Sequence, residues 1–137
     1  MSKPEAVRVA GLGCQRGCTA QALLQLMTSS LQRQGLAIKD ISALASIDLK
    51  SREPGLLALA EQLALPLQFF SAQQLAGYES RLSHRSPLAF EHTGCHGVAE
   101  SAALALASRA GAAELLISRQ KSPQATFALA IVLPTDQ

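Results

Sequence analysis

The sequence has no tryptophan, one tyrosine and four phenylalanines among its 137 residues. Single-stranded nucleic acid is usually held on stacked aromatic side chains, and this chain offers few of them. Charge of one sign is also lacking, because 12 lysines and arginines stand against 10 aspartates and glutamates, a formal net charge of +2. We therefore expect no nucleic acid among the partners.

Long apolar runs are absent as well. Residues 127–133 form one of the longer runs, and they fall far short of the roughly 20 residues that a membrane-spanning helix needs. Near the start of the chain Glu5 stands where a secretory signal would carry only bases, and Arg8 interrupts the apolar residues that follow. We expect no membrane association and a cytoplasmic location.

The sequence contains only three cysteines, which is an odd number. Cys14, Cys18 and Cys95 suit a reducing compartment, so disulfides are not expected. A chain of this length buries roughly two-thirds of its unfolded surface and needs no such staple. With 48% hydrophobic and 16% charged residues, the composition predicts one folded domain over residues 1–137, with loose tails at residues 1–5 and 134–137.

Strand-like and helix-like patterns alternate along the chain. Apolar residues at helical spacing predict a helix from Ala20 to Leu31 capped by Thr19 or Cys18, and Pro54 and Pro66 bound a second helix. Strands are predicted at 6–12, 41–47 and 67–70, a capping box at 71–74, an alanine-rich helix at 98–110, and an antiparallel hairpin from 114–119 and 126–133. The pattern predicts an α/β layered fold with a mixed sheet flanked by helices and a C-terminal antiparallel hairpin.

Residues 78–94 follow neither pattern, so no regular element is expected there. Within this segment, residues 80–87 form a basic, serine-rich stretch without an acid, which is typical of a binding loop or a disordered one, and we interpret it as a candidate lid.

A glycine-rich turn follows the first predicted strand and leads into a helix. It contains Gly13, Cys14, Arg16 and Gly17. Backbone N–H groups at such a turn can face an anion, and the Arg16 guanidinium would add a bidentate contact to a carboxylate or phosphate. The spacing matches neither a dinucleotide fingerprint nor a P-loop, and a simple tight connection is the alternative.

Polar residues also crowd the end of the second predicted strand. They are Ser46, Asp48, Lys50, Arg52 and Glu53. Because ligands lie beyond the carboxyl ends of strands in open α/β sheets, this loop and the glycine turn are expected to line one crevice. The alternative is a solvated loop with Glu53 capping the next helix.

A third glycine-bearing loop opens the alanine-rich helix and contains Gly94, Gly97 and Glu100. His92, Cys95 and His96 are chemically able to bind metal, but the paired spacing of zinc ligands is missing, so no metal and no cofactor are expected. A nucleophilic role for Cys14 or Cys95 is a weaker hypothesis, since a helix N-terminus lowers the pKa of a thiol.

Three segments together carry a family resemblance. They are Gly11 to Gly17, Leu44 to Ser46 with Asp48, Lys50 and Glu53, and Gly97 to Glu100 with Ala102 to Leu104. In this order and spacing the chain resembles the CobE family, which is similar to the C-terminal domain of CbiG, from about Val7 to Leu133. The resemblance implies a role in corrin synthesis with a precorrin or hydrogenobyrinic-type tetrapyrrole as ligand, and other corrin-pathway enzymes as partners.

Precorrins are flat apolar macrocycles rimmed with carboxylates, so a fitting site needs apolar walls and scattered bases. The bases that would supply such contacts are Arg16, Lys50, Arg52, Arg81, Arg85, Arg119 and Lys121. We expect carriage of the ligand or an accessory role in ring contraction. The predicted binding residues are Gly13, Cys14, Arg16, Gly17, Ser46, Asp48, Lys50, Glu53, Gly94, Gly97, Glu100 and Lys121.

Two alternatives stay open. CbiG proteins open a lactone on cobalt-precorrin-5A and release acetaldehyde, so the resemblance also allows a hydrolase, with Asp48, Glu53 or Glu100 as general acid–base. A phosphate- or nucleotide-binding regulatory module is the alternative outside the family.

Overall fold

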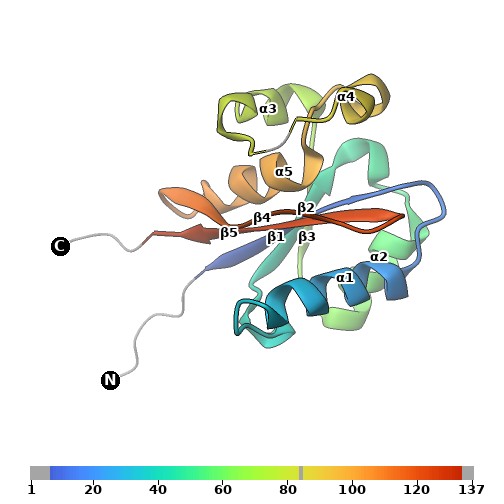
Figure 1. The fold of residues 1–137 in the computed structure, drawn as a ribbon, viewed down its shortest axis with the longest axis vertical. Coiled ribbons are helices and arrows are strands. Elements are labelled where there is room, and N and C mark those ends of the chain that lie inside the picture. The colour runs from blue at the N-terminus through green and yellow to red at the C-terminus, as the bar shows by residue number, and fades with distance from the viewer. Residues whose placement is uncertain (1–6, 84, 134–137) are drawn as a thin grey trace.

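Five strands form one mixed sheet in the order β3-β2-β1-β5-β4 (Figure 1). The computed structural model describes residues 7–83 and 85–133, so the predicted tails at 1–5 and 134–137 lie outside the described residues. The parallel strands are β1 (Arg8–Cys14), β2 (Ala43–Ile47) and β3 (Leu67–Phe70). β5 (Ala125–Val132) is antiparallel to both β1 and β4 (Ala113–Lys121), which confirms the α/β fold with a C-terminal hairpin.

Helices cover both faces of this sheet (Figure 1). α1 (Ala20–Gln32) and α2 (Pro54–Leu63) pack on one face, around a core that includes Leu23, Met27 and Leu44. α5 (Val98–Ala107) packs on the other, with α3 (Ala72–Ala76) and α4 (Pro87–Thr93) on the same side. Three short 3₁₀ turns complete the described elements: η1 (Ile38–Asp40), η2 (Asp48–Lys50) and η3 (Glu79–Arg81).

Local sequence signals fix several boundaries. The Thr19 hydroxyl accepts the N–H of Ala22 at 3.0 Å and caps α1, as predicted. Pro54 lies in the first turn of α2, where its missing N–H costs nothing. Ser71 and Gln74 form the predicted capping box at the start of α3.

Gly11 sets the distance between β1 and α5. A Cβ atom at this position would lie 1.8 Å from the carbonyl oxygen of Ala99, so only glycine lets the helix come this close. The buried face of α5 is built from small residues, among them Ala102 and Ala103. The small side chains of this alanine-rich helix thus allow it to approach the sheet closely.

The segment 78–94 differs from the prediction. It contains η3 and the helix α4, where no regular element was expected. Pro87 begins α4, and the N–H of Phe90 donates to the carbonyl of Ser86. Leu88 and Phe90 are 64% and 47% exposed, so these two large apolar side chains of α4 do not mark a buried face. The alanine-rich helix also ends at Ala107 rather than at residue 110.

Candidate functional site

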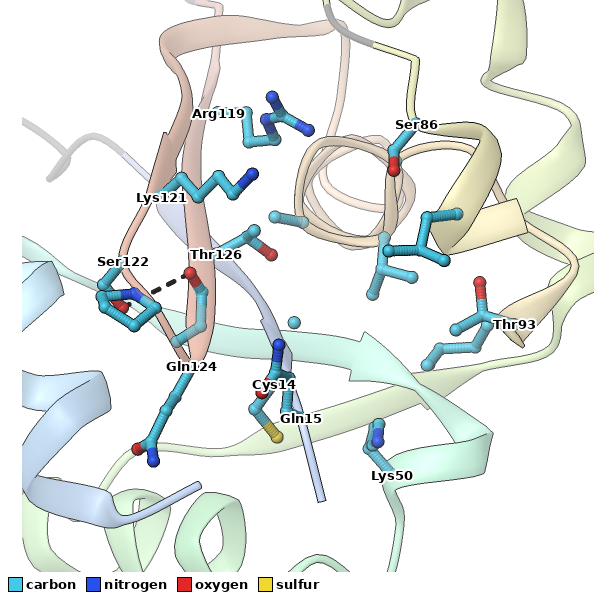
Figure 2. A pocket seen from close by; sticks show the side chains of 18 of the residues that line it. Cys14, Gln15, Lys50, Ser86, Thr93, Arg119, Lys121, Ser122, Gln124 and Thr126 are labelled. Atoms are coloured by element: carbon cyan, nitrogen blue, oxygen red, sulfur yellow. Dashed lines mark hydrogen bonds between the residues drawn. The ribbon is translucent and has the colours of Figure 1, made fainter. Parts of the chain in front are cut away.

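A pocket of about 620 Å³ opens beyond the carboxyl ends of β1 and β2. Its lining comes from the glycine turn after β1, from Ile47 and Lys50 after β2, from the start of α5, and from the turn between β4 and β5. Leu88 of α4 also lines the pocket, and Figure 2 shows Ser86 and Thr93, at the two ends of α4, on the side opposite Arg119 and Lys121 of β4. Segments distant in the sequence thus form one crevice at the switch between the parallel strands and the hairpin, where open α/β sheets usually bind ligands.

The charged side chains in this lining are all basic. Arg16, Lys50, Arg119 and Lys121 line the pocket, and within the described part of the chain no aspartate or glutamate does. A net charge of only +2 for the whole chain therefore hides a local positive field.

These four cations lack partners. Within residues 7–83 and 85–133 their side chains make no hydrogen bond or ion pair with another residue. The Nε of Arg119 is, in addition, buried without a hydrogen-bond partner. Burying an unsatisfied donor costs about 1–3 kcal/mol, so the arrangement favours an anionic ligand that would satisfy it.

The rest of the lining is largely apolar or small. Ile47, Leu88, Val98, Ala99 and Ala125 contribute apolar surface between the cations. Pockets with apolar walls and a few placed charges are typical of sites for large organic ligands.

The structure divides the predicted binding residues into two groups. Those that line the pocket are Gly13, Cys14, Arg16, Lys50, Gly97 and Lys121. Those outside its lining are Gly17, Ser46, Asp48, Glu53, Gly94 and Glu100.

The glycine turn satisfies one of its own N–H groups with a carboxylate. Gly17 has φ of +84°, and its N–H donates to Oε2 of Glu53 at 3.0 Å. The N–H of Gln15 donates to the carbonyl of Gln124 at 2.9 Å. These two groups therefore connect the turn to α2 and to the β4–β5 turn, and Arg16 is left as the contact that the turn offers to an anion.

Ser46, Asp48 and Gly94 lie outside the pocket lining, in three different local environments. Ser46 is fully buried, and its hydroxyl donates to the carbonyl of Leu12 at 2.6 Å. Asp48 is exposed in the first turn of η2, and Gly94 has φ of +78° after α4. The hydroxyl of Ser46 is therefore engaged within the fold, whereas Asp48 and Gly94 lie outside the pocket lining.

Glu100 lies behind the pocket wall. It is 1% exposed, and its carboxylate accepts the N–H of Ser83 at 2.7 Å, the hydroxyl of Ser83, and the N–H of Arg119 at 2.8 Å. The acid thereby joins α5, β4 and the segment before α4. Its role in the structure is to hold the backbone that carries Arg119.

The cysteines near the glycine turn are poor nucleophiles. Burial raises the pKa of Cys14 to about 12, with a further contribution from neighbouring Cys18. Burial likewise raises the pKa of Cys18. The lowering of a thiol pKa that the weaker hypothesis required is therefore wrong for Cys14, because desolvation disfavours the thiolate.

Sequence reasoning did not reveal the contact between His96, which lines the pocket, and Glu79. His96 lines the pocket, and its Nδ1 lies 2.7 Å from Oε1 of Glu79. No sequence motif connects two residues 17 positions apart in different elements. Within the described residues no group of three or more histidine, cysteine, aspartate or glutamate side chains forms a metal site.

Comparison with known proteins decides the family. Residues 8–130 match the family described as cobalamin synthesis G C-terminus. The chain belongs to this family. It is therefore a cobalamin biosynthesis protein of the CobE/CbiG group, which confirms the resemblance.

Relatives and a solved structure agree with this. The chain is 41% identical over 129 residues to Protein CobE of a Sinorhizobium species, covering 94% of this chain and 82% of the relative. A crystal structure of CobE from the cobalamin (vitamin B12) biosynthetic pathway has a TM-score of 0.91 at 43% identity, covering 96% of this chain and 94% of that one. A cobalt-precorrin-5A hydrolase of Priestia megaterium is 30% identical over 122 residues, which are 89% of this chain but 31% of that protein.

None of the helices within residues 7–83 and 85–133 is both long enough and apolar enough to span a bilayer.

Proposed function

We propose that this member of the CobE/CbiG family binds a carboxylate-rich tetrapyrrole intermediate in the pocket beyond β1 and β2. It serves as a carrier or accessory factor during corrin synthesis. The observation that carries the proposal is the lining itself, in which Arg16, Lys50, Arg119 and Lys121 are unpaired and no described carboxylate competes with a ligand.

The chemistry of the ligand matches this lining. A precorrin presents a flat apolar ring and a rim of acetate and propionate groups. Leu88 and Val98 offer apolar surface to the ring, and the cations offer charge-assisted hydrogen bonds to the rim. Two relatives are named for a cobalt-bearing precorrin, so metallated and metal-free intermediates are both candidates.

We place the protein in the cytoplasm beside other corrin-pathway enzymes. The free thiols of Cys14, Cys18 and Cys95 support a reducing compartment. A carrier must pass its ligand to a further enzyme, so a pathway enzyme is the expected protein partner.

Titration calorimetry with hydrogenobyrinic acid tests the proposal. We expect micromolar or tighter binding, about −8 kcal/mol or better. Arg16→Ala and Lys50→Ala should each weaken binding at least about tenfold, because each removes a charge-assisted contact of about 1.5–3 kcal/mol. Lys39→Ala is the matched control, since Lys39 is exposed in η1 and does not line the pocket.

The proposal fails if the wild-type chain gives no heat with this ligand or with a cobalt-bearing counterpart. It also fails if Lys39→Ala weakens binding as much as Lys50→Ala does, because binding would then depend on overall charge and not on the pocket.

Hydrolysis of a precorrin-5A-like lactone is the second candidate, and the likeness to the Priestia megaterium hydrolase favours it. The carboxylates considered for acid–base chemistry, Asp48, Glu53 and Glu100, all lie outside the pocket lining. Turnover would change the absorption spectrum of the intermediate and release acetaldehyde. An unchanged spectrum with a bound intermediate would leave carriage as the function.

A further inference from the structure

Positive charge reaches the pocket from two sides. Arg16 and Lys50 follow β1 and β2, whereas Arg119 and Lys121 belong to β4. Figure 2 shows Lys50 across the pocket from Arg119 and Lys121. Val98 lines the same pocket and offers apolar surface. One ligand that contacts both groups of cations must therefore carry negative charge on more than one edge.

The charge of Arg119 is partly removed from water. Its Nε is buried, and within the described residues this atom has no hydrogen-bond partner. Glu100, which is 1% exposed, accepts the backbone N–H of Arg119 at 2.8 Å and so fixes this part of β4. A charge that is shielded from water interacts more strongly with an opposite charge than an exposed one does. An anionic group beside Arg119 therefore gains more than one beside an exposed lysine.

The start of α5 adds to the positive field. Gly97, which precedes the helix, has no side chain to cap it. The first N–H groups of an α-helix have no acceptor within the helix, and they form the positive end of its dipole. Val98 and Ala99 carry two of these groups and line the pocket. The helix therefore favours an anionic group over a neutral one in the same pocket that the four cations line.

A carboxylate and an amide differ in what they offer to this lining. An ionised carboxylate has two acceptor oxygens and a charge, whereas a primary amide has one acceptor oxygen, two N–H donors and no charge. Lysine and arginine side chains are donors only. Within the described residues the lining contains no aspartate or glutamate, so no charged acceptor faces the amide N–H groups. Converting a carboxylate of the ligand into an amide thus removes the attraction and places donors opposite donors.

We propose that this pocket selects a tetrapyrrole whose peripheral carboxylates are ionised, and excludes the same ring once these groups have been converted into amides. Arg119 is the specificity-determining residue. The proposal rests on the proposed function and adds the chemical state of the ligand to it. It also implies an order, since the class of reaction that forms amides at these carboxylates must act after the ring has left this protein.

Titration calorimetry with a matched pair of ligands tests this. Hydrogenobyrinic acid and the same ring with its carboxylates converted into primary amides share the macrocycle and its apolar surface. We expect the full chain to bind the amide at least about a hundredfold more weakly, because hydrogen bonds to charged acceptors are roughly twice as strong as neutral ones. Raising the salt concentration from about 0.1 M to about 1 M should weaken binding of the acid and leave binding of the amide nearly unchanged, because salt screens charge interactions.

Variants assign the selectivity to the cations of β4. Arg119→Met should weaken binding of the acid about tenfold and change binding of the amide by less than about twofold, so the ratio of the two affinities falls. Lys121→Ala, at an exposed position, should lower this ratio by a smaller factor, about threefold. Lys39→Ala, outside the pocket lining, should leave the ratio unchanged.

The outcomes separate this proposal from the proposed function. Equal affinity of the wild-type chain for the acid and the amide would overturn the selectivity and leave binding of the ring intact. Failure of both ligands to bind would overturn both proposals. If Arg119→Met weakened binding of both ligands equally, Arg119 would support the pocket and not its selectivity, and its assignment as the specificity-determining residue would be rejected.

Discussion

The buried carboxylate of Glu100 accepts the backbone N–H of Arg119 at 2.8 Å, so an acid in α5 holds the strand segment that carries a pocket cation. β4 is an edge strand, and its N–H groups that face away from β5 find no partner in the sheet. Glu100 satisfies one of them and thereby connects the core to the pocket.

Replacing Glu100 with glutamine should destabilise the fold and weaken ligand binding. The carboxylate accepts three hydrogen bonds from Ser83 and Arg119, and the amide offers one acceptor oxygen in place of two. We expect a loss of about 1–3 kcal/mol in the free energy of unfolding, measured in urea. Glu114→Gln, at an exposed position of β4, should stay within about 0.5 kcal/mol of wild type. Equal effects of the two changes would contradict the role given to Glu100.

Removing the Arg119 guanidinium should raise the stability of the fold while weakening ligand binding. Arg119→Met keeps an apolar stem and removes a buried Nε that has no partner, so the free energy of unfolding should rise by up to about 1–3 kcal/mol. The same change should weaken binding of hydrogenobyrinic acid about tenfold, through loss of a charge-assisted contact. Urea unfolding and calorimetry on the same preparations measure both. A variant that loses stability would show that Arg119 supports the fold.

A methyl group at Gly11 should be poorly tolerated. Its Cβ would lie 1.8 Å from the Ala99 carbonyl oxygen, so Gly11→Ala must push α5 away from β1 at a cost of about 3 kcal/mol or more. Gly77→Ala is the matched control, because Gly77 has φ of −63° and its nearest contact would be at 3.5 Å. We expect the control to fall within about 1 kcal/mol of wild type. Thermal or urea unfolding distinguishes the two.

Burial of Cys14 predicts slow alkylation and a specific loss of stability in alkali. With the pKa of Cys14 raised from its ordinary value of 9.0 to about 12, the thiolate is rare in the folded protein at neutral pH. Iodoacetamide should therefore modify Cys14 more slowly than a denatured control, as followed by mass spectrometry. Rapid modification at neutral pH would contradict this.

The stability change follows from the same pKa. Between pH 9.0 and about 12 the unfolded chain releases the Cys14 proton while the folded chain retains it. Fewer protons are then bound in the unfolded state, so the free energy of unfolding falls as the pH rises through this window. Cys14→Ala should flatten this dependence in part, since the raised pKa of Cys18 acts in the same direction. A slope unchanged by the substitution would assign the effect to other groups.

Local signals made much of the fold predictable. Thr19, Pro54 and the pair Ser71 and Gln74 mark helix starts through contacts within one turn, so sequence alone locates them. α4 was missed because it spans only 7 residues and its large apolar residues, Leu88 and Phe90, are exposed and so do not mark a buried face.

The site was predictable only in part. Arg16 and Lys50 follow strands whose carboxyl ends meet at one edge of the sheet, so topology brings them to the pocket. The N–H of Gly17 donates to the Glu53 carboxylate, and the buried carboxylate of Glu100 accepts the N–H of Arg119. Both are tertiary contacts that no local sequence pattern reveals. The pairing of Glu79 with His96 depends on how η3 and the start of α5 pack, which sequence spacing does not encode.

The four positive charges of Arg16, Lys50, Arg119 and Lys121 repel one another at the pocket, and a polyanionic ligand of the proposed kind would reduce that repulsion. Because such a ligand would bind the native state in preference to the unfolded chain, it would raise the thermal midpoint by an amount that grows with its concentration. The melting temperature would then report how much of the protein carries ligand, and ligand binding would protect the chain from unfolding and proteolysis.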